Sequence, residues 1–124
     1  MPTRSLNSSV LKWPDAETVH LEITRWGDKL SKSRSDIIRI GYFGSYANNN
    51  WGVGSDLDVV VVIEHANQPF EKRTLEWDTT ALPVPVDLLI YTRQEWDNLD
   101  KQSRFYGTVM RECIWIHQRA ENSD

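Results

Sequence analysis

The sequence predicts a chain of the α/β class, in which short β-strands alternate with helices. Three runs of β-branched, aliphatic and aromatic residues, at 37–43, 59–63 and 84–91, have the composition of buried strands. Between them, apolar residues recur every three or four positions, which is typical of one face of a helix. A last short run at 114–117 predicts a fourth strand.

The length of 124 residues predicts one domain, 1–124, with a single core. Residues 1–12 and 118–124 are polar with little periodicity, so we expect both ends to be flexible. The net charge is −4 and the isoelectric point is near 5.3. This acidic balance disfavours a nucleic-acid polymer as substrate, because such binding depends on basic surface.

Cys113 is the only cysteine, which excludes an internal disulfide and fits a reducing compartment. No apolar run approaches the roughly 20 residues that a membrane-spanning helix needs. We therefore expect a soluble, cytoplasmic protein with no membrane partner.

The first expected element is an amphipathic helix over 14–31. Pro14 and Asp15 are suited to its first turn. Its apolar face, at spacings of four, three and four residues, consists of Val19, Ile23, Trp26 and Leu30. This face is expected to pack on the sheet.

The first strand, 37–43, ends at Gly44-Ser45. Glycine adopts dihedrals closed to other residues and lets a ligand approach the backbone, and serine is a favoured helix N-cap. The turn is therefore a candidate binding site for an anion such as phosphate. The residues after it, 46–55, contain three asparagines and two glycines, which predict a short helical turn and a mobile loop.

Asp56 and Asp58 open the second strand, and on a strand they point to the same face. Two carboxylates so close favour a hard divalent cation, Mg²⁺ or Mn²⁺, which completes its coordination with phosphate and water. Alternatively, these acids merely begin a strand and Gly44-Ser45 is an ordinary turn. The apolar run at 59–63 argues against this alternative, because it predicts a central strand.

The second half of the chain predicts an outer helix over 69–79, a third strand over 84–91, helices over 93–100 and 103–111, and the last strand. Thr92 is a natural N-cap for the helix that follows it. Asp87 is a carboxylate within the apolar third strand, which is costly to bury uncompensated. It either joins Asp56 and Asp58 in a metal cluster or is satisfied by backbone amides or an arginine.

Gly44-Ser45, ten intervening residues, Asp56-x-Asp58 and a later aspartate in a third strand resemble the DNA polymerase β-type nucleotidyltransferase superfamily, and in particular the minimal nucleotidyltransferases. The resemblance covers about residues 36–117. It implies a mixed sheet of about four strands flanked by helices.

The resemblance also implies the role of each residue. Asp56 and Asp58 would bind one or two Mg²⁺ ions, Gly44 and Ser45 would contact the β- and γ-phosphates of ATP or another nucleoside triphosphate, and Asp87 would bind the second ion and help to deprotonate an acceptor hydroxyl. The sequence departs from the family at Asn48, where a basic residue is frequent. Five basic residues are candidate substitutes, although each also fits a solvated surface charge: Arg39, Lys72, Arg73, Arg93 and Arg104.

Two functions from different classes follow from the resemblance. The first is transfer of a nucleoside monophosphate, AMP from ATP, to a hydroxyl of a partner protein, as in antitoxins that act on small helical HEPN-type proteins. The second is a non-catalytic module that binds and neutralises such a partner. A third alternative is a small-molecule transferase of the aminoglycoside-modifying type. The sequence leaves open the nucleotide, the acceptor, a homo- or hetero-oligomeric state, and whether Trp51 packs in its loop or stacks on a base.

Overall fold

The computed structural model describes residues 13–120. The expected flexible segment 1–12, and the last four residues of the segment 118–124, lie outside this range. In chain order the elements are α2 (Ala16–Ser33), β1 (Ile37–Phe43), the 3₁₀ turn η1 (Gly44–Tyr46), β2 (Leu57–Ile63), the 3₁₀ helix η2 (Phe70–Glu76), β3 (Val86–Thr92), α3 (Arg93–Asp97), α4 (Arg104–Glu112) and β4 (Ile114–Gln118).

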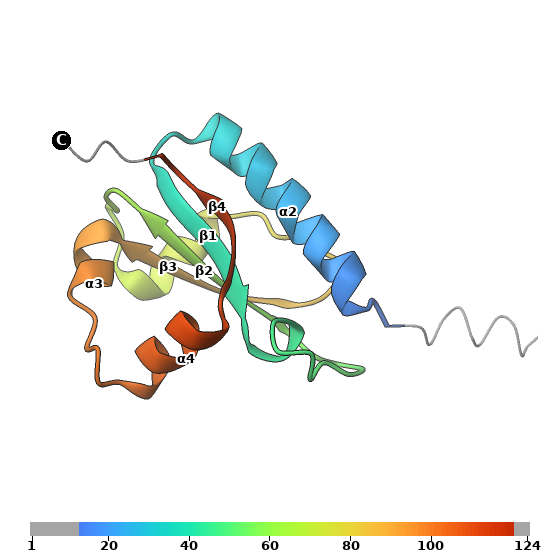
Figure 1. The fold of residues 1–124 in the computed structure, drawn as a ribbon. Helices are drawn as coiled ribbons and strands as arrows, with labels where there is room; N and C mark the ends of the chain where they lie inside the picture. The colour runs from blue at the N-terminus through green and yellow to red at the C-terminus, as the bar shows by residue number, and fades with distance from the viewer. Residues whose placement is uncertain (1–12, 121–124) are drawn as a thin grey trace, which may run out of the picture.

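The four strands form one mixed sheet in the order β3-β2-β1-β4 (Figure 1). β1 is antiparallel to both β2 and β4, whereas β2 and β3 are parallel. β2 has a neighbour on each side and is buried along almost its whole length, as the apolar run 59–63 predicts. The predicted fold class, a mixed four-stranded sheet flanked by helices, is confirmed.

The helix α2 lies along one face of the sheet, and its predicted apolar face is the one that is buried. Val19, Ile23 and Trp26 are buried there. The helix begins at Ala16 because Asp15 is its N-cap, with a side chain that accepts a hydrogen bond from Thr18 N at 2.9 Å. The core of the fold therefore lies between α2 and the sheet.

The helix α4 lies on the opposite side of the sheet from α2 (Figure 1). Aromatic side chains from α4, β1 and β3 pack together there. Phe105 of α4 contacts Phe43 edge-to-face, with ring centroids 5.8 Å apart, and also contacts Tyr91 of β3. Val109, one turn further along α4, is fully buried. The end of β1 and the parallel strands β2 and β3 are thus held from both faces.

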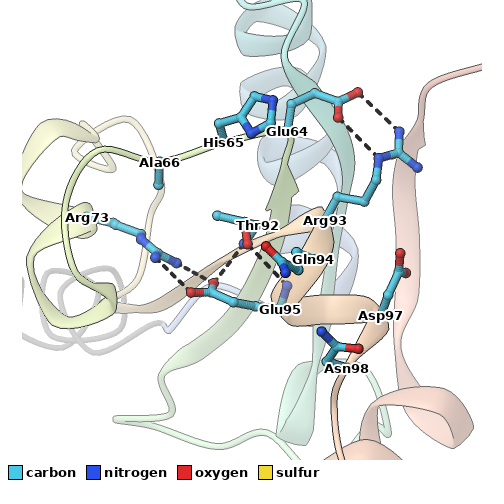
Figure 2. A pocket seen from close by; sticks show the side chains of 10 residues that line it. All are labelled: Glu64, His65, Ala66, Arg73, Thr92, Arg93, Gln94, Glu95, Asp97 and Asn98. Atoms are coloured by element: carbon cyan, nitrogen blue, oxygen red, sulfur yellow. Dashed lines mark hydrogen bonds and ion pairs between the residues drawn. The ribbon is translucent and has the colours of Figure 1, made fainter.

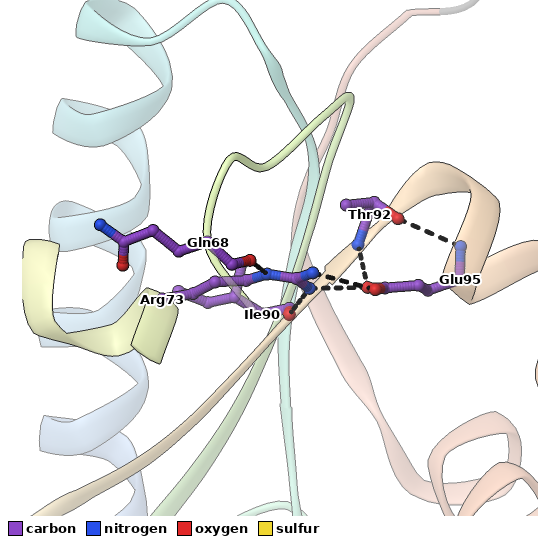
Figure 3. Close-up of polar contacts among 5 residues, drawn as sticks. All are labelled: Gln68, Arg73, Ile90, Thr92 and Glu95. Carbon is purple, nitrogen blue, oxygen red and sulfur yellow. Dashed lines mark hydrogen bonds and ion pairs between the residues drawn. The ribbon is translucent and has the colours of Figure 1, made fainter. Parts of the chain in front are cut away.

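The expected outer helix over 69–79 is instead the shorter 3₁₀ helix η2, and Arg73 within it is buried, with only 8% of its surface exposed. Figure 3 shows its guanidinium between η2 and the start of α3. It donates to both carboxylate oxygens of Glu95, at 2.6 and 2.9 Å, and to the carbonyls of Gln68 and Ile90. The prediction that Arg73 is a solvated surface charge is therefore wrong, because four acceptors compensate its burial.

Other element boundaries also differ from the prediction. β3 begins at Val86, two residues late, because Pro85 has no N–H to donate to a ladder. The expected flexible segment 118–124 is wrong at its start, because Gln118 belongs to β4 and the N–H of Arg119 donates to Ile38 O at 2.7 Å. Among the described residues, no helix is long and apolar enough to cross a membrane.

Candidate active site

The turn after β1 depends on Gly44 in two ways. Its φ is +82°, in the left-handed region that glycine favours, and its carbonyl accepts hydrogen bonds from the N–H groups of Ala47 and Asn48, both at 3.0 Å. A β-carbon at this position would overlap Oδ2 of Asp58. The turn therefore has this geometry, with a carboxylate against its backbone, only with glycine at position 44.

Asp58 is the second residue of β2 and lies beside this turn, because the antiparallel ladder pairs it with Phe43. Its neighbours Leu57 and Val59 are fully buried in the core under α2, so Asp58 points to the opposite face, where it is half-buried. Asp56 directly precedes β2 and is exposed. The strand pairing thus brings the turn and the Asp-x-Asp sequence together.

Asp87 is paired directly with Asp58 in the parallel β2–β3 ladder. This register places the third strand beside the strand that follows Asp56 and contains Asp58. The expected burial of Asp87 is wrong, because β3 is an edge strand and the side chain is exposed near its beginning. The Asp87 carboxylate is not bound by a backbone amide or an arginine either, since no described residue forms a hydrogen bond or ion pair with this side chain.

The three carboxylates form an uncompensated negative region. Burial raises the pKa of Asp58 above its usual value, and the charges of Asp87 and then Asp56 raise it further. Among residues 13–120, no cationic side chain is paired with any of the three. By contrast, hydrogen bonds from arginines lower the pKa of Glu64 and of Glu95 to about 2.

The donor set fits a hard divalent cation, although the expected convergence of three carboxylates is not observed. In the described part of the chain, no group of three or more His, Cys, Asp or Glu side chains is placed to hold a metal ion. Mg²⁺ is commonly held by only one or two carboxylates, with phosphate and water as its other ligands. Oxygen donors with no competing cation, as at Asp58 and its neighbours, match that requirement.

The basic residues considered as substitutes for a phosphate contact do not gather here. The guanidinium of Arg39 lies over the ring of Trp115, 4.8 Å from its centroid, and Arg93 pairs with Glu64. Lys72 and Arg104 are exposed. Asn48 itself is neutral, and its amide donates to the Glu112 carboxylate at 3.4 Å.

The loop between the turn and Asp56 contains contacts that the sequence did not reveal. Trp51 stacks on Tyr46 with an angle of 8° between the rings and 5.8 Å between their centroids. Tyr46 is buried, and its hydroxyl accepts a hydrogen bond from Trp13 Nε1 at 2.7 Å. The sequence feature that could have indicated this stack is the presence of two aromatic residues five positions apart in a segment otherwise rich in Asn and Gly.

A cavity of about 610 Å³ lies at the other end of the sheet (Figure 2). It follows the last residues of β2 and β3, about 20 Å from Asp58 at the usual rise per strand residue. Its charged groups are paired with one another: Glu64 with Arg93, and Arg73 with Glu95. Because these charges are compensated, the cavity is a poorer candidate for phosphate or metal chemistry than the carboxylates.

The thiol of Cys113 is not a nucleophile candidate. Burial raises its pKa to about 12, so almost no thiolate is present near neutral pH. A β-carbon on Gly41 would lie 2.5 Å from its sulfur, which shows how closely β1 packs against the start of β4. Cys113 therefore has a packing role.

Comparison with known proteins gives the family. Residues 28–116 match the nucleotidyltransferase domain, which is more than half of the chain, so the chain belongs to that family and is a nucleotidyltransferase. No curated protein matches it.

Two solved structures are similar in fold. One, described as a nucleotidyltransferase from Sulfolobus solfataricus, has a TM-score of 0.60 at 14% identity and covers 84% of each chain. The other is a toxin–antitoxin structure with AMP-PNP, with a TM-score of 0.53 at 17% identity, covering 77% of this chain and 73% of that one. At these identities the likeness concerns the fold.

Proposed function

We propose that this protein transfers a nucleoside monophosphate, AMP from ATP, to a hydroxyl of a partner protein, with Mg²⁺ or Mn²⁺ as cofactor and Gly44, Ser45, Asp56, Asp58 and Asp87 as the site. The observation that carries the proposal is the pairing of Asp58 with Asp87, beside the Gly44 turn and with no compensating cation in the described part of the chain. A half-buried carboxylate that is repelled by two neighbouring acids, as at Asp58, needs a functional reason.

Each residue has a distinct part in the proposed reaction. Asp56 and Asp58 hold the divalent cation, Asp87 contributes to a second one, and Gly44 and Ser45 contact the β- and γ-phosphates. When bound there, the metal supplies positive charge that activates the attacking oxygen and neutralises the pyrophosphate. The acceptor oxygen bonds to the α-phosphorus as the bond to the bridging oxygen of pyrophosphate breaks. Asp87 accepts the proton of the acceptor hydroxyl.

The acceptor is expected on another chain. The described elements build one sheet and its two covered faces, and we place the acceptor hydroxyl outside them. The likeness to a toxin–antitoxin structure with AMP-PNP supports a protein partner and a nucleotide. We propose a small helical HEPN-type protein as that partner, in a hetero-oligomer.

A non-catalytic module that binds the same partner is the second candidate. The neutral Asn48 favours it, because this side chain supplies no positive charge beside the phosphate turn and its amide is bound to the Glu112 carboxylate. The retained acids favour the enzyme, since a scaffold gains nothing from mutual repulsion at Asp58. Transfer to a small molecule of the aminoglycoside type remains a third alternative, with no structural observation in its favour.

The deciding experiment is label transfer from ATP labelled at the α-phosphate, with Mg²⁺ and the protein encoded by the adjacent gene. Wild type should label the partner, and Asp58→Asn should lose at least about 100-fold in rate, as for loss of a catalytic electrostatic group. The matched control is Asp28→Asn, which removes an exposed α2 carboxylate paired with Lys32. Equal labelling by Asp58→Asn, or tight binding of the partner without labelling, would exclude the enzymatic proposal.

A further inference from the structure

The loop between Ser45 and Asp56 connects the two halves of the proposed site. Tyr46 follows Ser45 directly, and the turn over 52–55 leads directly into Asp56. Whatever holds this loop therefore affects both the phosphate contacts and the first metal ligand. The asparagines and glycines of the loop give it little intrinsic rigidity.

One end of the loop is fixed firmly. Only 3% of the surface of Tyr46 is exposed, and its hydroxyl accepts from Trp13 Nε1 at 2.7 Å and donates to Pro14 O at 3.2 Å. Asn50 N donates to Ser45 O at 2.9 Å, which closes the first half of the loop. Tyr46 is thus a rigid surface attached to the segment that precedes α2.

The second half of the loop is held in a different way. In the described structure, residues 51–55 form hydrogen bonds only among themselves, from Gly52 N to Ser55 Oγ and from Ser55 N to Gly52 O. Val53 is 80% exposed, and a β-carbon on Gly52 or Gly54 would meet nothing within 4 Å. The remaining attachment of this stretch is the Trp51 ring, which stacks on Tyr46 and packs against the core.

From these contacts we infer that Trp51 is a positioning residue. Its stack on Tyr46 holds the 52–55 turn and so restricts Asp56, the metal ligand outside the β-ladder. Asp58 is fixed by strand pairing, and Leu57 N is bonded to Pro85 O, so neither depends on the stack. This inference rests on the proposed function of Asp56, but the attachment of the loop itself does not.

The stack on Tyr46 should lower the entropic cost of ordering the backbone before Asp56 when a cation binds. If the stack is removed, the backbone before Asp56 samples more conformations, and a cation must order it on binding. Affinity for the cation should fall by roughly 3- to 10-fold, the range expected for loss of one aromatic stack. Phenylalanine at position 51 keeps a ring on Tyr46 and should retain most of the effect.

The experiment uses Trp51→Ala, Trp51→Phe and, as matched control from the same loop, Val53→Ala. Amide hydrogen exchange of the full chain without metal should be faster over 47–56 in Trp51→Ala alone, with unchanged protection in the β2 ladder. The affinity for Mn²⁺, measured by electron paramagnetic resonance, should fall in Trp51→Ala and stay near wild type in the other two. Unchanged exchange over 47–56 would overturn the inference.

A double variant tests whether Trp51 acts through Asp56. In an Asp56→Asn background, Trp51→Ala should cause no further loss of Mn²⁺ affinity, because the ligand that it positions is already gone. Additive losses would mean a general structural effect and would overturn the positioning role. If wild type binds no Mn²⁺, both the proposed metal site and the positioning role of Trp51 are overturned. Faster exchange in Trp51→Ala would still establish that Trp51 attaches the loop.

Discussion

Oδ2 of Asp58 occupies the space that a β-carbon on Gly44 would need. This contact joins the candidate phosphate turn to the central carboxylate of the site, across the β1–β2 ladder. Position 44 therefore requires glycine for two reasons: the space beside it is occupied by Asp58, and its backbone has a positive φ.

Gly44→Ala should therefore displace the Asp58 carboxylate, and we expect nucleotidyl transfer to fall by at least about 10-fold, as for misplaced catalytic groups. The chain offers two controls. Gly54→Ala has a similar φ, +89°, with no atom nearby, and Gly52→Ala has neither problem. Thermal unfolding should show a loss of about 1 kcal/mol in Gly54→Ala, from the left-handed backbone, and at least as large a loss in Gly44→Ala, where the overlap with Asp58 is added. Wild-type transfer by Gly44→Ala would contradict the contact argument.

Asp58→Asn should make the metal-free protein more stable while it abolishes transfer. Removing a half-buried charge that is repelled by Asp87 and Asp56 should add about 0.5–2 kcal/mol to the free energy of unfolding, the usual scale of a stability–activity trade-off. Added Mg²⁺ should raise the unfolding midpoint of wild type but not of the variant. A variant less stable than wild type without metal would argue against the repulsion.

Arg73→Ala should destabilise the fold, because Glu95 and the Gln68 and Ile90 carbonyls would lose their donor (Figure 3). We expect a loss of about 2–3 kcal/mol, less than for a fully buried pair, since the Glu95 side chain is 43% exposed. Arg73→Lys should recover only part of the lost stability, because an ammonium cannot bond both carboxylate oxygens in the same geometry. The control Arg25→Ala removes an exposed pair with Glu22 and should change stability by less than about 0.5 kcal/mol in urea unfolding.

Glu95 also predicts a pH dependence. Its folded-state pKa, about 2, lies below the ordinary 4.5, mainly because Arg73 donates to it. A carboxyl with a lowered pKa stabilises the fold above its unfolded pKa and loses that contribution as the pH falls from about 4.5 towards 2. Glu95→Gln should be less stable than wild type at pH 7, and the two proteins should approach each other over this window. Urea midpoints that stay equally far apart from pH 7 to 2 would contradict the assignment.

The elements themselves followed closely from local patterns. The spacing of Val19, Ile23 and Trp26 predicted the buried face of α2, and Thr92 and Ser103 are the N-caps of α3 and α4. The apolar run 59–63 predicted the central strand. Such patterns succeed because a helix or a buried strand imposes its period on neighbouring residues.

The errors at Arg73, Asp87 and the end of the chain concern groups whose environment comes from distant parts of the chain. Arg73 is buried because the chain after β3 places Glu95, 22 residues later in the sequence, against its guanidinium. Asp87 is exposed because β3 is the sheet edge, which its own composition does not reveal. The prediction of a flexible end from 118 failed because Arg119 bonds to Ser35 and Ile38 near β1. No local period carries that information.

The sequence by itself determined the order of helices and strands and the spacing of Gly44, Asp56 and Asp58, because these depend on neighbouring residues. Only the tertiary structure decided that Asp87 pairs with Asp58, that Asp58 lies against Gly44, and that no arginine of residues 13–120 neutralises them. The physical reason is strand register: hydrogen bonds between distant segments decide which carboxylates become neighbours. The same long-range packing places Trp51 on Tyr46, within the segment that joins both halves of the site.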